Sequence, residues 1–312
     1  MYSLSNLLSY FNSRYASTFF ICQIPRGLNP VIVSLVTENT LNSHPLNRLR
    51  VQAVGSQIQN NIQITECLSP LHSRFDDMNV LIEWIELNRI LGINYFTVYV
   101  TSVTQRVLDT LEFYRNKGVL EIVNWPISEV INLSDVDYFG QQVALNDCLY
   151  RNKRNTKFIM SVDLDEFIVP QSSEHNSIQD ILSTLPMASC YMFRHLTFYR
   201  PSLNEENKIF SLSNVYRSPE ILQPRIRSKV IVVADDVTTL AVHDTWALKN
   251  GLTHFVGTNL GLLHHYKQDV VAEDGWWKSR QSQNVNKVMF KYKDKLVQNV
   301  KHVMGSLKEN IN

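Results

Sequence analysis

The chain has 312 residues, of which 44% are hydrophobic and 19% charged, and its 30 basic and 29 acidic residues leave a formal net charge of +1. This composition is that of a globular protein with enough length for one large core or two smaller ones. A nearly neutral chain has no basic footprint for nucleic acid and no general attraction to an anionic membrane, so any phosphate binding must be local.

The first 60 residues are expected to form an N-terminal segment of strands and loops that packs on the main domain. Two strand-length apolar runs, residues 17–24 and 31–36, flank a turn with two prolines and a glycine. Neither run approaches the roughly 20 residues needed to cross a bilayer, so we expect a soluble chain as written. The following Asn-, Ser- and Gln-rich stretch predicts loop, with one further strand near 49–54.

A regular alternation of strands and helices begins at residue 61. The expected strands are 65–68, 94–100, 119–123 and 158–162, and the expected helices are 79–91, 103–116 and 138–151. Such alternation predicts an α/β fold with a mainly parallel, Rossmann-like sheet and right-handed crossovers. The sequence has no G-x-G-x-x-G loop, so it gives no support for dinucleotide binding.

The regular pattern stops after Pro170. The remaining patterns indicate a helix at 178–185, strands at 190–199, 229–233 and 260–267, a β run ending at 242–244, a loop region at 200–228 and basic helices from 270 onward. We expect residues 61–170 to bind a nucleotide and residues 171–300 to bind the other substrate. Residues 301–312 are expected to be a C-terminal tail.

Four cysteines are widely spaced in the sequence and form no C-x-x-C pair: Cys22, Cys67, Cys148 and Cys190. A cysteine zinc site is therefore not expected, and the chain is too long to be a disulfide scaffold. One or two disulfides remain open, without an assigned pairing.

Three carboxylates follow the apolar strand at 158–162: Asp163, Asp165 and Glu166. Unpaired charges inside a core cost several kcal/mol, so these acids should face solvent or a cation at the carboxyl end of the strand, where α/β sheets bind ligands. In an extended segment Asp163 and Asp165 point to one side and Glu166 points away. This arrangement favours a Mg²⁺ or Mn²⁺ site shared with a phosphate-bearing substrate, with a solvated strand end as the alternative.

Two aspartates cannot complete an octahedral shell, so phosphates, water or another side chain must contribute. His264 and His265 end a second expected strand, and imidazole suits Mn²⁺ better than Mg²⁺. A buried histidine with a backbone hydrogen bond is the alternative for either. His243 and Asp244 end a further β run, as a strand cap or as groups that contact substrate.

Several short motifs, taken in order, resemble glycosyltransferase family 92, formerly a domain of unknown function. They are the stretches 65–71, 83–86, 91–92, 96–99, 142–149, 162–170, 242–243 and 265–267. The resemblance runs from about residue 18 to about residue 280. It implies a GT-A fold, in which helices flank the mainly parallel sheet and an irregular half receives the acceptor. It also implies inverting transfer of a hexose, typically galactose, from a UDP-sugar to a glycan acceptor.

The resemblance assigns roles to particular residues. It implies that Asp163, Asp165 and His265 hold Mn²⁺, with Mg²⁺ as the alternative ion, and that Leu68, Ser69, Pro70 and Asp163 border the UDP-sugar. Successive strand residues face opposite sides, so only one of the two adjacent histidines can face the metal. The resemblance selects His265, which stands immediately before Tyr266.

Inversion also requires a general base within hydrogen-bond reach of the acceptor hydroxyl. Asp244 is our first choice because it ends a strand and lies between the acids and the histidine in sequence. The alternatives are Asp236, Glu273 and Asp274, and Trp276 and Trp277 either stack on a sugar or belong to the core.

Family members act on fucose of N-glycan cores in animals and on pectic galactan in plants, so we expect an N-glycan or polysaccharide acceptor and no nucleic acid. Members are usually anchored in the Golgi membrane, which implies the Golgi or secretory pathway. This chain shows no amino-terminal anchor, and its start could be incomplete.

Two other classes of protein are alternatives. A phosphatase with an aspartate nucleophile would need Thr or Val where Phe167 stands. A catalytically inactive glycan-binding or scaffold protein that retains the GT-A fold would not need clustered acids.

Overall fold

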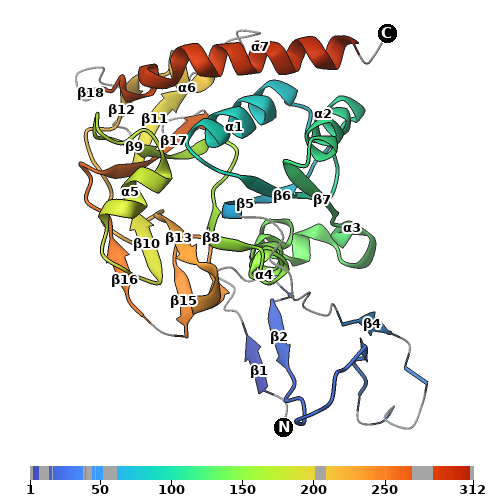
Figure 1. The fold of residues 1–312 in the computed structure, drawn as a ribbon. Helices are drawn as coiled ribbons and strands as arrows, with labels where there is room; N and C mark the ends of the chain where they lie inside the picture. Colours follow the sequence, from blue (N-terminus) through green and yellow to red (C-terminus); the bar gives the residue numbers. More distant parts are fainter. Residues whose placement is uncertain are drawn as a thin grey trace.

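The computed structural model of the chain describes residues 62–200, 209–249, 251–268 and 284–309. Before residue 62 it describes residues 3–6, 14–15, 17–37, 39, 44–45 and 47–51. These residues form one α/β body, with a smaller group of strands that projects from it (Figure 1).

A seven-stranded sheet forms the centre of the body. Its strands are β5 (Ile62–Leu71), β6 (Tyr95–Val100), β7 (Leu120–Asn124), β8 (Thr156–Ser161), β10 (Cys190–Phe193), β13 (Lys229–Val233) and β16 (Thr253–Phe255). They lie in the order β16-β10-β13-β8-β5-β6-β7, and β8, β5, β6 and β7 run parallel. The run β7-β6-β5-β8 has the 3-2-1-4 strand order of a Rossmann-like half, which confirms the expected fold class.

The helices that connect these strands cover both faces of the sheet. Helices α1 (Met78–Ile90) and α2 (Gln105–Asn116) lie on one face, and α4 (Gln141–Asn152) lies on the other (Figure 1). The alternation of side chains along β5 explains this sandwich. Leu68 packs in the same core as Trp84 of α1, whereas Cys67 packs in the core that α4 supplies with Leu145.

A second, five-stranded sheet carries the irregular half. Its order is β18 (Asn284–Val285), β12 (Tyr216–Arg217), β11 (His195–Arg200), β17 (Gly261–Gln268) and β9 (Glu166–Pro170). The single strand expected at 190–199 is therefore two strands, β10 and β11, which part at Arg194 and belong to different sheets. In the second sheet His265 of β17 lies opposite Glu166 of β9, which brings the histidine to the acids.

Short elements complete the body. They are α3 (Ile127–Val130), η2 (Leu133–Asp135), η3 (Asp137–Gly140), α5 (Ile178–Thr184), α6 (Phe210–Ser213), η4 (Ala234–Asp236), β14 (Val237–Leu240), β15 (Thr245–Leu248) and η7 (Val288–Tyr292). Helix α7 (Lys293–Glu309) lies across α1 (Figure 1). The expectation of a C-terminal tail at 301–312 is wrong for the described residues 301–309. Helix α7 continues to Glu309 and buries Val303 and Leu307 in the main core.

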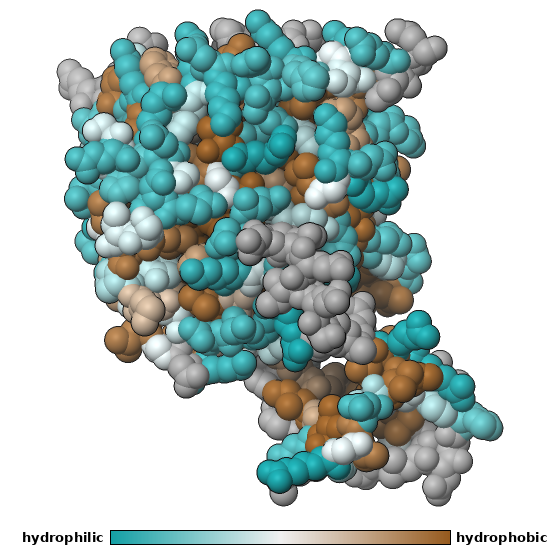
Figure 2. Space-filling model, in the orientation of Figure 1, coloured by the Kyte–Doolittle hydropathy of each residue, from teal (hydrophilic) through white to brown (hydrophobic). Residues whose placement is uncertain are grey.

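The N-terminal segment contains β1 (Ser3–Asn6), β2 (Thr18–Ile21), β3 (Ile32–Val33) and β4 (Leu49–Arg50). It contacts the body where the Tyr15 backbone N–H donates to the Asp135 carbonyl at 3.0 Å and where the Phe19 ring meets the Tyr150 ring. Apolar side chains remain on its surface (Figure 2). No described helix combines the length and the apolar character that crossing a membrane requires.

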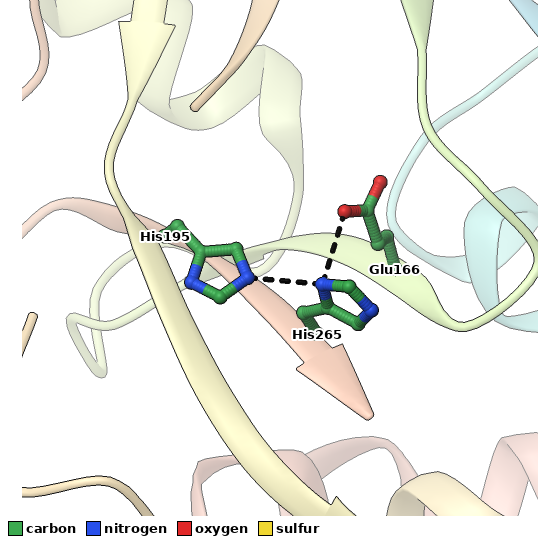
Figure 3. A group of neighbouring side chains, drawn as sticks. All are labelled: Glu166, His195 and His265. Carbon is green, nitrogen blue, oxygen red and sulfur yellow. Dashed lines mark hydrogen bonds and ion pairs between the residues drawn. The ribbon is translucent and has the colours of Figure 1, made fainter. Parts of the chain in front are cut away.

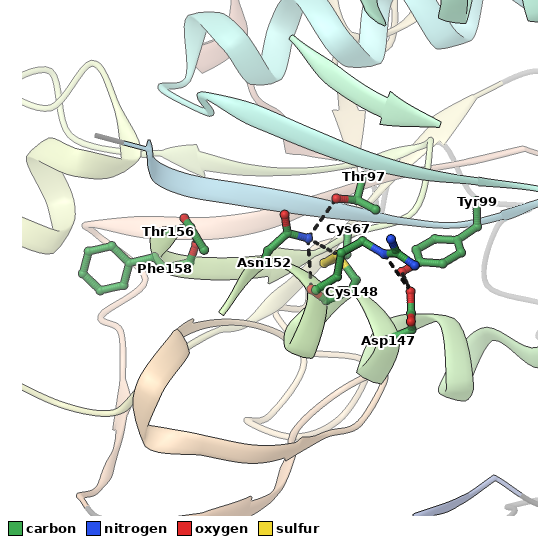
Figure 4. Close-up of a disulfide and its surroundings, with 9 residues drawn as sticks. Cys67, Thr97, Tyr99, Asp147, Cys148, Asn152, Thr156 and Phe158 are labelled. Carbon is green, nitrogen blue, oxygen red and sulfur yellow. Dashed lines mark hydrogen bonds and ion pairs between the residues drawn. A yellow bond between two sulfur atoms is a disulfide. The ribbon is translucent and has the colours of Figure 1, made fainter. Parts of the chain in front are cut away.

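A disulfide ties the central sheet to one flanking helix. Cys67 of β5 and Cys148 of α4 are bonded, with their Cα atoms 6.1 Å apart (Figure 4). This gives the pairing that the sequence left open. Cys22 and Cys190 are free thiols, the first exposed and the second buried.

Candidate active site

Asp163 lies at the point where the strand order of the central sheet reverses. It follows β8, and its Oδ1 accepts a hydrogen bond from Ser69 Oγ of the adjacent strand β5 at 2.8 Å. Gln141, the first residue of α4, donates to the same Ser69 oxygen at 2.6 Å and to Asp163 Oδ1 at 3.3 Å. Ligands of open α/β sheets bind outside the strand ends at such a reversal.

Of the three β5 residues expected to border a nucleotide, one reaches this point with its side chain. Leu68 and Pro70 are buried, whereas Ser69 is half-buried and contacts Asp163. Leu68 and Pro70 can therefore contribute backbone and shape but no polar side chain to a donor site.

A buried lysine that was not predicted from the sequence forms ion pairs with two of the three acids. Lys229 Nζ lies 3.0 Å from Asp163 Oδ2 and 3.1 Å from Glu166 Oε2, and its side chain is 1% exposed. Strand β13 runs antiparallel to β8 with Ile231 opposite Met160, so Lys229 lies just beyond the end of β8. Burial alone would raise the pKa of Asp163, but the Lys229 charge and the Ser69 hydrogen bond lower it to about 2.

The expectation that Glu166 points away from the acids is wrong. Leu164 and Asp165 form a turn between β8 and β9, so the segment is not extended. Glu166 Oε2 accepts the Asp163 backbone N–H at 3.0 Å, and Oε1 lies 3.3 Å from His265 Nδ1. Burial raises the pKa of Glu166 even though Lys229 opposes the shift.

His265 joins the second half of the chain to the acids. Its Nε2 lies 3.2 Å from Asp165 Oδ2, and the next residue, Tyr266, donates its backbone N–H to the Asp165 carbonyl at 2.8 Å. Burial would lower the pKa of His265, but the Asp165 hydrogen bond and the nearby carboxylates raise it. The structure thus brings together Asp165 and His265, two of the three expected metal ligands.

The neighbouring histidine faces the opposite side of β17, as alternation along a strand requires. His264 is fully buried, Gln171 Nε2 donates to its Nε2 at 2.9 Å, and its ring packs on Phe198 at 4.4 Å. Burial lowers the pKa of His264 to about 3, so the ring is neutral. This histidine is part of the core.

A third histidine, His195 of β11, stands behind His265. Its Nε2 lies 2.9 Å from His265 Nδ1, and the residue is 1% exposed (Figure 3). Burial lowers its pKa to about 3. One atom each of Glu166, His195 and His265 lies within 4.8 Å of the others. His195 was not among the residues predicted from the sequence, although a polar residue inside an aromatic-rich strand was a signal for it.

The donor atoms at this point fit a divalent cation. Asp165 and His265 are partly exposed, at 32% and 18% of their side chains, and present an oxygen and a nitrogen to each other. A mixed oxygen and imidazole set suits Mn²⁺. The Asp163 oxygens already have protein partners, yet 37% of that side chain is exposed, so it can still meet a ligand.

Two of the candidate general bases have side-chain partners of their own. Asp244 Oδ2 pairs with Arg225 Nε at 3.2 Å, and its Oδ1 accepts the Thr245 backbone N–H at 2.7 Å. Asp236 accepts from Ser189 Oγ at 2.8 Å. It lies in η4, which follows β13 at the end opposite Lys229. Glu273, Asp274, Trp276 and Trp277 lie outside the described residues.

The sequence profile of glycosyltransferase family 92 matches residues 62–312. The chain belongs to this family. Among curated relatives, a family 92 protein of Caenorhabditis elegans, F13G3.3, is 23% identical over 197 residues, which cover 60% of this chain and 38% of that protein. The beta-1,4-galactosyltransferase galt-1 of the same organism is 25% identical over 261 residues, which cover 79% and 59%. The family 92 chain thus spans between 38% and 59% of the length of these relatives.

Among solved structures, glucosyl-3-phosphoglycerate synthase from Mycobacterium tuberculosis, in complex with Mn²⁺, UDP and glucosyl-3-phosphoglycerate, aligns with a TM-score of 0.33 and 13% identity. The alignment covers 82% of this chain and 86% of that one.

Proposed function

We propose that this family 92 protein is a metal-dependent, inverting glycosyltransferase that moves a hexose from a UDP-sugar to a glycan acceptor. The observation that carries the proposal is the position of Asp163, Asp165 and His265 at the reversal of strand order. Family membership supplies the reaction class. Galactose is the favoured sugar because a galactosyltransferase is among the relatives.

The donor would bind at the carboxyl ends of β5 and β8. Ser69, Gln141 and Lys229 hold Asp163 ionised and fixed, so its exposed part can orient the nucleotide-sugar. Asp165 and His265 would hold Mn²⁺, with Asp163 as the third expected ligand and Mg²⁺ as the alternative ion. When bound, the cation supplies positive charge that offsets the charge of the departing UDP diphosphate.

His195 and Glu166 would keep His265 in the orientation that a metal ligand needs. Both lie against His265 Nδ1, at 2.9 Å and 3.3 Å, while Nε2 faces Asp165. A proton held on Nδ1 leaves the lone pair of Nε2 free, and partners behind a ligating histidine usually fix the ring in this way.

Fewer side-chain contacts indicate which residues would serve the acceptor than indicate which would bind the donor. Asp244 stays our proposed base, with a carboxylate that is 26% exposed beside the Arg225 guanidinium.

The buried disulfide between Cys67 and Cys148 supports a Golgi or secretory location, because disulfides persist in oxidising compartments. Such a location gives access to N-glycan or polysaccharide acceptors.

A donor panel tests the proposal. Purified protein is incubated with Mn²⁺ and UDP-galactose, UDP-glucose or GDP-mannose, and the released nucleotide is measured. We expect UDP release, fastest from UDP-galactose, and none from an Asp165→Asn variant. Preference for GDP-mannose would refute the donor assignment. No release from any donor, even with candidate glycan acceptors present, would favour the alternative of an inactive glycan-binding protein.

A further inference from the structure

One tripeptide in the chain is a motif for covalent modification and has no role in the proposed transfer reaction. Asn132-Leu133-Ser134 is the one N-x-S/T triplet, with x other than proline, in the 312 residues. This triplet is the acceptor motif for N-linked glycosylation in proteins of the secretory pathway. A motif of three residues is common by chance, so its placement in the fold decides its meaning.

The triplet lies on the surface, in the connection from α3 to η3. Asn132 and Ser134 are both exposed. Asn132 Oδ1 accepts the Ser134 backbone N–H at 3.2 Å, so the carboxamide oxygen is held by the turn. Within the described part of the chain, Asn132 Nδ2 has no hydrogen-bond partner and can carry a substituent without breaking a contact.

A second observation places the chain where such a modification occurs. The Cys67–Cys148 disulfide joins a central strand to a helix, and both cysteines are buried. Disulfides of this structural kind form in the oxidising compartments of the secretory pathway. The oligosaccharide donors and the transferase for asparagine reside in the same compartments.

We propose that Asn132 is an N-glycosylation site. In this step Asn132 Nδ2 forms a bond to the anomeric carbon of a lipid-diphosphate-linked oligosaccharide. The bond between that carbon and the diphosphate oxygen breaks, the lipid diphosphate leaves, and one amide proton passes to a base of the host oligosaccharyltransferase. The proposal does not depend on the transferase activity of this chain.

The position of Asn132 also determines which part of the protein a glycan would lie beside. Asp135, three residues after Asn132, receives the Tyr15 backbone N–H through its carbonyl at 3.0 Å. A glycan on Asn132 would therefore stand beside the contact between the N-terminal segment and the body. The connection continues into η3, whose Phe139 stacks on His72 with ring centroids 3.4 Å apart.

The test uses the full chain, secreted from eukaryotic cells behind a cleavable leader and treated with peptide-N-glycosidase. We expect one downward mobility shift on treatment, with Asn132 converted to Asp in the peptide mass spectrum. Asn132→Gln and Ser134→Ala should each abolish the shift, and Ser134→Thr should retain it. Asn155→Gln, at an exposed asparagine outside any such triplet, should leave the shift unchanged.

Two results would overturn the proposal. One is secreted wild-type protein that contains the disulfide but shows an unmodified Asn132 peptide. The other is a shift that persists in both Asn132→Gln and Ser134→Ala. Because the wild-type peptide is read directly, poor folding of one variant does not decide the outcome.

Discussion

Ser69 donates its hydroxyl hydrogen to Asp163 Oδ1 at 2.8 Å, although 94 residues separate the two in sequence. Their strands, β5 and β8, are parallel neighbours, and the strand order reverses between them. The end of β5 and the acids that follow β8 therefore meet at one edge of the sheet.

The two adjacent histidines of β17 should behave differently when each is replaced by alanine. His265→Ala removes the nitrogen that faces Asp165, so we expect weaker Mn²⁺ binding and a large loss of UDP release. His264→Ala removes a buried ring that is hydrogen-bonded to Gln171, so we expect a loss of unfolding free energy of about 1–3 kcal/mol with Mn²⁺ binding retained. Urea unfolding and Mn²⁺ titration of both variants make the comparison. The reverse pattern would move the ligand to His264.

Lys229→Met should destabilise the fold strongly. The change leaves Glu166, which is 2% exposed, without its cation, and breaking a buried ion pair costs about 3–5 kcal/mol. The loss of the Asp163 ion pair adds less to this destabilisation, because 37% of the Asp163 side chain is exposed to solvent. Urea unfolding measures the loss, with Lys308→Met at an exposed position as the control. The double variant with Glu166→Gln should recover part of the stability. A single variant as stable as the control would show that Lys229 does not neutralise these acids.

His195 should act on metal binding through His265. His195→Leu removes the nitrogen 2.9 Å from His265 Nδ1, and changes behind a ligating histidine usually cost about 10–100-fold in metal affinity. We expect the Mn²⁺ concentration for half-maximal UDP release to rise by that factor, with a smaller change in maximal rate. His195→Gln, which offers an amide near the same place, should restore part of the affinity. His302→Leu on the exposed side of α7 is the control. Equal effects of Leu and Gln would indicate a role in packing alone.

Glu66 should make stability fall with rising pH. It is fully buried on β5, neither oxygen has a hydrogen-bond partner among the described residues, and burial raises its pKa well above the ordinary value. A raised folded pKa gives stability that is complete below the unfolded pKa of about 4.3 and is lost as pH rises toward the folded value, by about 1.4 kcal/mol per unit.

Glu66→Gln should remove this dependence. Urea unfolding of wild type and variant from about pH 4.5 to about pH 7.5 shows it as two curves that diverge with pH. Glu309→Gln, at an exposed position of α7, should run parallel to wild type. Parallel curves for Glu66→Gln as well would show that Glu66 is not held protonated.

Local patterns in the sequence were sufficient to predict the alternation of strands and helices in the regular half. The helix expected at 79–91 is α1, and the strand expected at 94–100 is β6, because apolar spacing and glycine stops are local signals. The acids after β8 and the histidine before Tyr266 could be found because each follows an apolar run. Their proximity could be inferred because ligand sites gather at strand ends.

The partners of these residues could not be read from the sequence. Lys229 reaches Asp163 through the antiparallel pairing of β13 with β8, and His195 reaches His265 diagonally across the parallel pair β11 and β17. Both contacts depend on strand register between distant segments. Glu166 was misplaced for a related reason, since a two-residue turn after Asp163 changes the side to which every later side chain points.

Calorimetry of UDP binding tests the central claim most directly, because it asks whether the acids and His265 form a metal-dependent nucleotide site. Wild-type protein and an Asp165→Asn variant are titrated with UDP in Mn²⁺ and in chelator, and their unfolding temperatures are compared. We expect wild type to bind UDP at least about tenfold more tightly in Mn²⁺, since the carboxylates would otherwise repel a diphosphate, and we expect the variant to lose this difference while unfolding at a similar temperature. Equal UDP affinity of the wild-type protein in Mn²⁺ and in chelator would contradict the account.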